Sequence, residues 1–162
     1  MAKVKRSLFK TFVNVGTSET PDYALLGEGI TTGEIQYNPQ TAEETYIHED
    51  SGTTEIESYR PTMPVEASCI AGDDVFDYID GLRQARAVLD AAKTDIVNVL
   101  LYEDEGLSGY PAEKQNVSIQ VDSFGGAGGE TNKINFTINY IGDPVAGEFD
   151  PDTATFTEDS GS

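Results

Sequence analysis

The sequence predicts a mainly β protein: a β-sandwich or barrel-like domain with one flanking α-helix, which is α+β in broad terms. Roughly six to eight short segments show strand-type alternation or short apolar runs between turn residues. Only residues 73–89 show the periodicity of an amphipathic α-helix. The length of 162 residues corresponds to about one domain.

The first predicted element is an N-terminal arm over residues 1–20, which ends where "TSETPD" introduces a proline. Residues 21–149 are predicted to form the folded domain, which begins with an apolar strand over 23–30. The polar segment 42–60 follows as a hairpin, with "EETYIHE" and "TTEIESYR" as its strands and "DSG" as its turn. A long hairpin with so few apolar residues is not stable alone, so it needs a partner surface or stays mobile.

The next strand and the helix are predicted from their apolar faces. Residues 62–70 place alternate apolar side chains on one face, which indicates a half-buried strand. Asp73 is a good N-cap for the helix, and Gly81 weakens the helix so that it ends near Gln84. The apolar residues of the strand are Met63, Val65, Ala67 and Cys69, and those of the helix are Val75, Phe76, Ile79 and Leu82.

The C-terminal half contains the clearest strand pattern. Residues 95–102 form a continuous apolar run, which predicts a central strand. Residues 116–124 and 133–141 alternate apolar with mostly uncharged polar side chains, and a glycine-rich connection joins them, so they predict an antiparallel pair. A loop is predicted between the central strand and this pair, and residues 150–162 are predicted to be a loose acidic tail.

Charge is the most unusual property of the composition. The chain has 29 acidic and 10 basic residues, a formal net charge of −19, yet four of the bases and no acid lie in the first ten residues. An acidic body repels nucleic acid, so specific binding of DNA or RNA by the folded part is not expected. General acidity for solubility and a specific electrostatic role remain open alternatives.

The sequence contains no recognisable catalytic, metal or cofactor site. Cys69 is the single cysteine and His48 the single histidine, so neither a disulfide nor a triad or zinc site can be assembled convincingly. The "GGAGGE" segment lacks the lysine of a phosphate-binding loop. We therefore expect no enzyme, no cofactor and no metal beyond adventitious calcium on acidic clusters. The basic start is followed by an interrupted apolar run, which predicts a non-exported chain with no membrane segment.

Several segments resemble, in their order, the major tail tube proteins of long non-contractile tailed bacteriophages and their prophages. The resemblance covers roughly residues 8–149, and its most specific part is "VDSFGGAGGE" followed by a strand and "GDPVAGEF". The other segments that carry it are "YNPQTAEETYIHED", "GDDVFDYIDGLR", "TDIVNVLLY" and "INFTINYI".

The resemblance implies a structural virion protein without enzymatic activity. Six copies would form a ring, stacked rings would form the tail tube, and neighbouring sheets would line a channel through which the genome passes during ejection. The implied partners are sister copies, a tape-measure protein and a terminator or connector protein, with assembly in the host cytoplasm. A phage virion and a domesticated phage-tail-like particle both fit.

The residues themselves suggest which parts serve such an assembly. DNA carries one negative charge per ~1.7 Å of its axis, so an acidic wall would keep it mobile in a channel. Glu55 and Glu57 are expected on one face of the hairpin and Ile56 on the other. The candidates for the channel lining are Glu43, Glu49, Glu55 and Glu57. The candidates for contacts between subunits are Lys3, Lys5, Arg6, Tyr46, Ile47, Gly125, Gly126, Gly128 and Gly129.

Two other function classes remain as alternatives. A non-enzymatic extracellular binding module, such as an adhesin or pilin-like domain, would be a stable monomer with exposed loops. A small hydrolase would use the acidic clusters, but no assembled site indicates a substrate.

Overall fold

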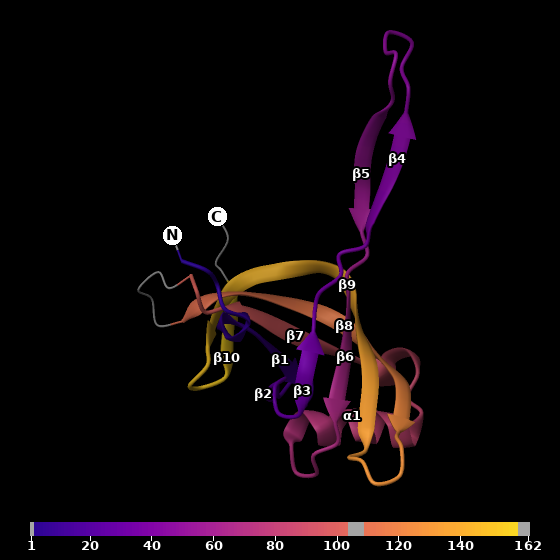
Figure 1. Ribbon diagram of the computed structural model, residues 1–162. Coiled ribbons are helices and arrows are strands. Elements are labelled where there is room, and N and C mark those ends of the chain that lie inside the picture. The colour runs from indigo at the N-terminus through magenta and orange to yellow at the C-terminus, as the bar shows by residue number, and fades with distance from the viewer. Residues whose placement is uncertain (1, 104–108, 159–162) are drawn as a thin grey trace.

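The computed structural model describes residues 2–103 and 109–158, in which one curved sheet of eight strands carries a separate two-stranded hairpin (Figure 1). The order in the sheet is β2-β1-β7-β8-β9-β6-β3, and β10 pairs with β9. A mainly β fold with one α-helix is therefore confirmed. The elements are η1 (Arg6–Leu8), β1 (Phe9–Asn14), β2 (Tyr23–Leu25), β3 (Ile30–Gly33), β4 (Pro39–Glu44), β5 (Thr53–Tyr59), β6 (Thr62–Ser68), α1 (Asp74–Ala85), η2 (Leu89–Ala92), β7 (Lys93–Leu100), β8 (Tyr110–Gly125), β9 (Lys133–Asp150) and β10 (Thr155–Glu158).

Strands β8 and β9 form the long central pair of the sheet, and they curve across it in Figure 1. Their antiparallel register runs from Tyr110 opposite Phe149 to Gly125 opposite Lys133, with shifts at two bulges. Both strands are longer than the sequence predicted: residues 110–115 of the predicted loop begin β8, and the segment 142–149 continues β9. Its glycines and proline concealed the strand, although alternate burial around the fully buried Phe149 is typical of one.

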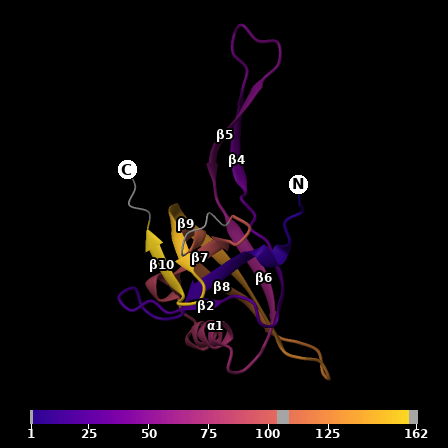
Figure 2. The ribbon, with the colours of Figure 1, turned by 90° about the vertical axis from the view of Figure 1, so that its left-hand side faces the viewer.

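The predicted apolar faces form the larger of two cores. This core fills the space between the sheet and α1, which covers one face of the sheet (Figure 2). A smaller core on the other face is centred on Phe149, whose ring packs 4.5 Å from that of Phe12. The buried members of the larger core are Val13, Met63, Val65, Ala67, Val75, Ile79, Ile96, Val117, Ile119, Ile134, Phe136 and Ile138.

The single α-helix begins where the sequence predicted. The side chain of Asp73 accepts a hydrogen bond from the backbone N–H of Phe76 at 3.0 Å, which is an N-cap. The helix ends at Ala85, because Arg86 adopts the left-handed conformation with φ of 49°. The predicted range 73–89 was therefore too long, whereas the expected end near Gln84 was close.

The predicted N-terminal arm is wrong for residues 9–14, which form β1 between β2 and β7. A buried polar network fixes this strand. The Asp95 carboxylate accepts hydrogen bonds from the Tyr23 hydroxyl at 2.5 Å and from the Asn14 side chain at 2.9 Å. Burial and, second, the bond to Asp95 raise the pKa of Tyr23 well above its usual value. The sequence did not reveal this network because its members are distant in sequence.

The C-terminal tail also differs from the prediction. Thr155–Glu158 form β10, which pairs with the end of β9 from Gly147 to Asp150. Phe156 packs on the smaller core, which explains why these residues are held. Residues 159–162 of the predicted tail, and residues 104–108 of the predicted loop before β8, lie outside the described residues.

Candidate assembly surfaces

The hairpin of β4 and β5 projects away from the sheet and from α1, as both ribbon views show (Figures 1 and 2). Its six-residue strand β4 alone spans roughly 20 Å at ~3.4 Å per residue. Tyr46 and Ile47 do not lie in a strand as expected, because β4 ends at Glu44 and residues 45–52 form the loop at the tip. Tyr46 is 44% exposed and Ile47 is fully exposed at 107%. The hairpin therefore presents a large apolar side chain at its far end.

The base of the hairpin has a defined geometry. Asn38 adopts a left-handed conformation with φ of 45°, and its side-chain amide donates to the carbonyl of Arg60 at 3.1 Å. It also lies 3.2 Å from the hydroxyl of Thr62, at the start of β6. The rings of Tyr37 and Tyr59 meet edge to face with centroids 6.3 Å apart. These contacts fix the direction in which the hairpin leaves the sheet.

The four glutamates predicted to line a channel do not share one surface. Glu43 lies opposite Thr54 and Glu55 lies opposite Ala42, so strand alternation places Glu43 and Glu55 on opposite faces of the hairpin. Thr41 pairs with Ile56 and Gln40 with Ser58, which leaves Glu57 as the extra residue of a bulge. The expected shared face of Glu55 and Glu57 assumed unbroken alternation, which the bulge interrupts. Glu49 lies in the tip loop, where its carboxylate accepts from the Thr53 hydroxyl at 2.8 Å.

The basic N-terminal residues divide into two groups. Arg6 is held within the chain, since its guanidinium donates to the carbonyls of Phe9 at 2.5 Å and Gly33 at 3.0 Å. Lys3 and Lys5 are exposed. The predicted contact between subunits thus concerns the two lysines more than Arg6.

The predicted glycines form the turn between β8 and β9, at the end of the sheet near α1 (Figure 1). Gly125 ends β8 with φ of 126° and Gly129 has φ of 82°, conformations that suit glycine. Gly126 and Gly128 are exposed in the same turn. The turn and the hairpin tip therefore lie at opposite ends of the molecule.

A second extended surface was not predicted as a site. On the face of β6, β9 and β8 that points away from α1, the cross-strand pairs are polar and mostly uncharged. Thr137 and Gln120 bind the two carboxylate oxygens of Asp122 at 2.7 and 2.6 Å. The alternation of residues in β8 and β9 did indicate this polar face in the sequence. It was not predicted as a site, because uncharged polar side chains on one face do not by themselves indicate a ligand or a reaction. Its residues, with one from the start of β7, are Thr62, Pro64, Glu66, Lys93, Ser118, Gln120, Asp122, Lys133, Asn135, Thr137 and Asn139.

The described residues show no group of three or more potential metal ligands. None of the helices they form is long and apolar enough to cross a membrane.

No family model matches the chain, and no curated protein sequence matches it. Among solved structures it is similar to the cap that terminates the tube of the anti-feeding prophage, with a TM-score of 0.53 and 14% identity over 91% of this chain and 93% of that chain. It is similar to a chain of the six-fold symmetrised baseplate of the anti-feeding prophage, with a TM-score of 0.52 and 11% identity over 90% and 97%. It is also similar to the sheath/tube terminator of an extracellular contractile injection system, PVC, with a TM-score of 0.51 and 14% identity over 90% and 97%.

These likenesses are at the level of the fold, because the sequence identities are low. The neighbours are structural components of contractile injection systems, whereas the resemblance in the sequence indicated a non-contractile tail. The narrower assignment to the major tail tube protein of a non-contractile phage stays a prediction.

Proposed function

We propose that this protein is a non-enzymatic structural subunit of a phage tail or tail-like particle, which assembles through sister copies into stacked six-membered rings around a channel for DNA. The observation that carries the proposal is the projecting hairpin with an exposed isoleucine at its tip. A two-stranded hairpin of mainly polar residues is marginal alone, so its length is best explained by a partner that it meets on assembly. The similar solved structures are of a sheath/tube terminator, a baseplate and a tube-terminating cap, and these assemblies support the proposal.

The rings require two different contacts on each copy. A side-to-side contact that closes gives the ring, and a head-to-tail contact propagates the stack. The short edge strands β2 and β3 leave backbone groups for the side-to-side contact, and the hairpin extends in a direction suited to the head-to-tail contact. A tape-measure protein and a terminator or connector would complete the tail in the virion, and the host cytoplasm is the proposed place of assembly.

The polar face of β6, β9 and β8 is the surface we assign to the channel, in place of the four hairpin glutamates. Amides and hydroxyls offer DNA no strong fixed cation, and the net charge of −19 per copy repels the phosphates. Of the two lysines on this face, Lys93 is paired with Asp90 at 3.1 Å, and Lys133 stands next to the β8–β9 turn. The duplex would therefore pass without specific binding.

Light scattering and negative-stain electron microscopy of the purified protein test this proposal. Rings or tubes are expected as protein and salt concentrations rise, because salt screens the repulsion between acidic copies. A strict monomer under all these conditions would refute it. In a second arm, an Asn-Gly turn replaces residues 42–55 between the paired Thr41 and Ile56, which shortens the hairpin without changing its base. This variant should fold and fail to form tubes.

A matched pair of point variants distinguishes a specific role of the hairpin tip from the general effect of adding a charge to the surface. Tyr46 and Tyr102 are both 44% exposed. Tyr46→Asp should impair assembly, whereas Tyr102→Asp should not, because only Tyr46 lies on the hairpin tip. Equal effects of the two variants would argue against the role of the tip.

A further inference from the structure

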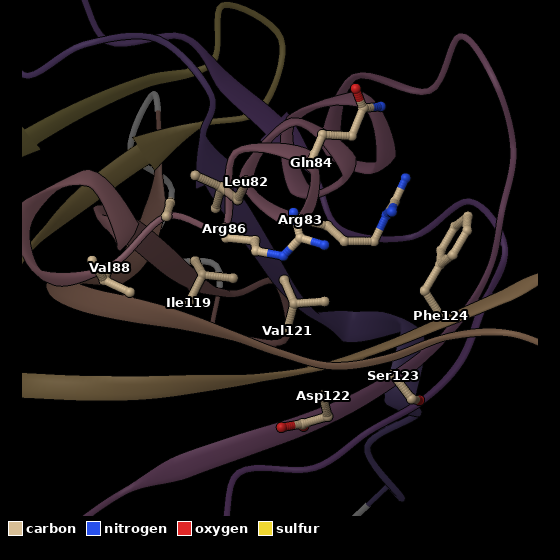
Figure 3. A pocket seen from close by; sticks show the side chains of 11 residues that line it. Leu82, Arg83, Gln84, Arg86, Val88, Ile119, Val121, Asp122, Ser123 and Phe124 are labelled. Carbon is tan, nitrogen blue, oxygen red and sulfur yellow. The ribbon is translucent and has the colours of Figure 1, made fainter.

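A groove between the C-terminal end of α1 and strand β8 adjoins the polar face described above, and Asp122 borders both. It encloses about 760 Å³, within the range of pockets that hold a small organic ligand or a few large side chains. Figure 3 shows its lining from the helix on one side and from β8 on the other. The apolar part of this lining consists of Leu82, Ala87, Val88, Ile119, Val121 and Phe124.

The groove also holds positive charge, which is scarce in this protein. Arg83 and Arg86, two of the ten basic residues, line it together with one acidic residue, Asp122, whose carboxylate accepts from Gln120 and Thr137. Arg83 is committed within the chain, because it forms an ion pair with Asp80 at 2.8 Å and covers the ring of Phe124 at 3.8 Å. Arg86 forms no side-chain hydrogen bond or ion pair with the described part of the chain. Its charge is therefore available to a partner.

The rim of the groove is unusually apolar for an exposed surface. Val88 is 69% exposed, and the adjacent Leu89 is 81% exposed in a left-handed conformation with φ of 53°. Exposed apolar residues beside a polar or charged rim mark interaction sites. The groove thus offers apolar contacts together with a cation.

The hairpin tip has the complementary chemistry. Its loop carries the exposed apolar side chains of Tyr46 and Ile47, flanked by Glu44, Glu49 and Asp50. The groove lies with α1 at the opposite end of the molecule from the tip (Figures 1 and 2). When the two surfaces of a contact lie at opposite ends of one chain, each copy can bind the next in the same way. Such a head-to-tail contact builds a stack and does not end with a closed dimer.

The geometry points to the groove as the receptor for the hairpin tip of a second copy. Ile47 and Tyr46 of that copy enter between α1 and β8, and its acidic side chains face Arg86. This inference deepens the proposed function and rests on it, since it names the acceptor of the head-to-tail contact.

A cross-link between two singly labelled proteins tests the contact. One protein carries Ile47→Cys and the other Val88→Cys, both in a Cys69→Ala background that removes the native thiol. Both positions are exposed, so the variants should fold. Mild oxidation of a 1:1 mixture should give a disulfide-linked dimer with one chain of each kind, which peptide mass spectrometry identifies. Tubes that form without this cross-link, or a dominant cross-link between two copies of the Ile47→Cys chain, would overturn the inference.

Charge exchange gives an independent readout. Arg86→Glu should raise the protein concentration needed for assembly by roughly tenfold, a factor that corresponds to about 1.4 kcal/mol, and Arg86→Lys should change it little. Adding Glu44→Arg and Asp50→Arg to Arg86→Glu should restore assembly. Tubes that are unaffected by Arg86→Glu would overturn the inference and leave the proposed function standing. Absence of tubes from the unmodified protein would refute the proposed function, and the inference with it.

Discussion

Two tyrosines with buried hydroxyls, of which only Tyr23 is bonded to a charged group, provide the sharpest test of the structure. The Tyr23 hydroxyl donates to the buried carboxylate of Asp95. The buried Tyr140 hydroxyl has no charged partner among the described residues: only the neutral side chain of Asn98 is near it, and no hydrogen bond of good geometry forms. Hydrogen bonds to charged groups contribute ~1.5–3 kcal/mol, so Tyr23→Phe should lower the free energy of unfolding by about 2 kcal/mol. Tyr140→Phe removes an unsatisfied hydroxyl, and should be neutral or stabilising by up to about 1 kcal/mol.

The partly buried Tyr140 should also differ from exposed tyrosines in its response to alkaline pH. Burial raises the pKa of Tyr140 to about 12, against an ordinary value of 10.0. Between pH 10 and about pH 12 the unfolded chain loses the Tyr140 proton that the native chain keeps. The free energy of unfolding therefore falls as pH rises, by at most ~1.4 kcal/mol per pH unit for one group. Tyr140→Phe should therefore lose roughly 1 kcal/mol less stability than the unmodified protein between about pH 8 and pH 11.

Urea unfolding followed by far-ultraviolet circular dichroism, at protein concentrations below those of assembly, measures both effects. At neutral pH the roughly 2 kcal/mol expected for Tyr23→Phe corresponds to a fall in Tm of about 4–8 °C. The exposed Tyr46→Phe serves as the control and should match the unmodified protein. A Tyr140→Phe variant as unstable as Tyr23→Phe would show that the two hydroxyls are not in the environments described, and the reasoning would fail.

Two glycines and one helix cap give further predictions. Gly147→Ala should disrupt the pairing of β10 with β9, because the added Cβ would lie 2.6 Å from the Phe156 ring, and faster amide exchange in residues 155–158 would report it. Gly81→Ala meets nothing within 4 Å and should stabilise α1 by up to ~1 kcal/mol in the same unfolding assay; a loss of stability would contradict this. Asp73→Ala should cost ~1 kcal/mol, and Asp73→Asn much less, since Asn also caps a helix.

The elements predicted best were those whose burial pattern is local. The alternation in β6, β8 and β9 and the stripe on α1 depend on one buried face. The structure buries most of the residues expected there, and it buries Cys69, Phe76, Leu82, Val121 and Tyr140 in part. The pattern did not fix the last residue of α1, because nothing in the sequence required Arg86 to adopt a left-handed conformation.

The parts predicted poorly depend on partners distant in sequence. The sequence predicts an arm where β1 forms, because the burial of β1 comes from β2 and β7 and from a network that joins Asn14 to Asp95 across 81 residues. The hairpin was predicted, but its register was not, because a bulge at Glu57 follows no simple alternation. That extra residue interrupts the alternation expected for Glu55 and Glu57, whereas Glu43 and Glu55 are separated by the cross-strand register and Glu49 by its place in the tip loop.

The left-handed Asn38 has a consequence for how quickly and tightly copies could join. The Asn38 side-chain amide contacts Arg60 and Thr62 at the base of the hairpin. The direction in which the hairpin projects is therefore set before it meets another copy. The conformational entropy lost in orienting the hairpin is then lost once, when the chain folds. It would not be lost again if the hairpin bound another copy. A hairpin with a flexible base would carry the same side chains and would bind more weakly than one with a fixed direction.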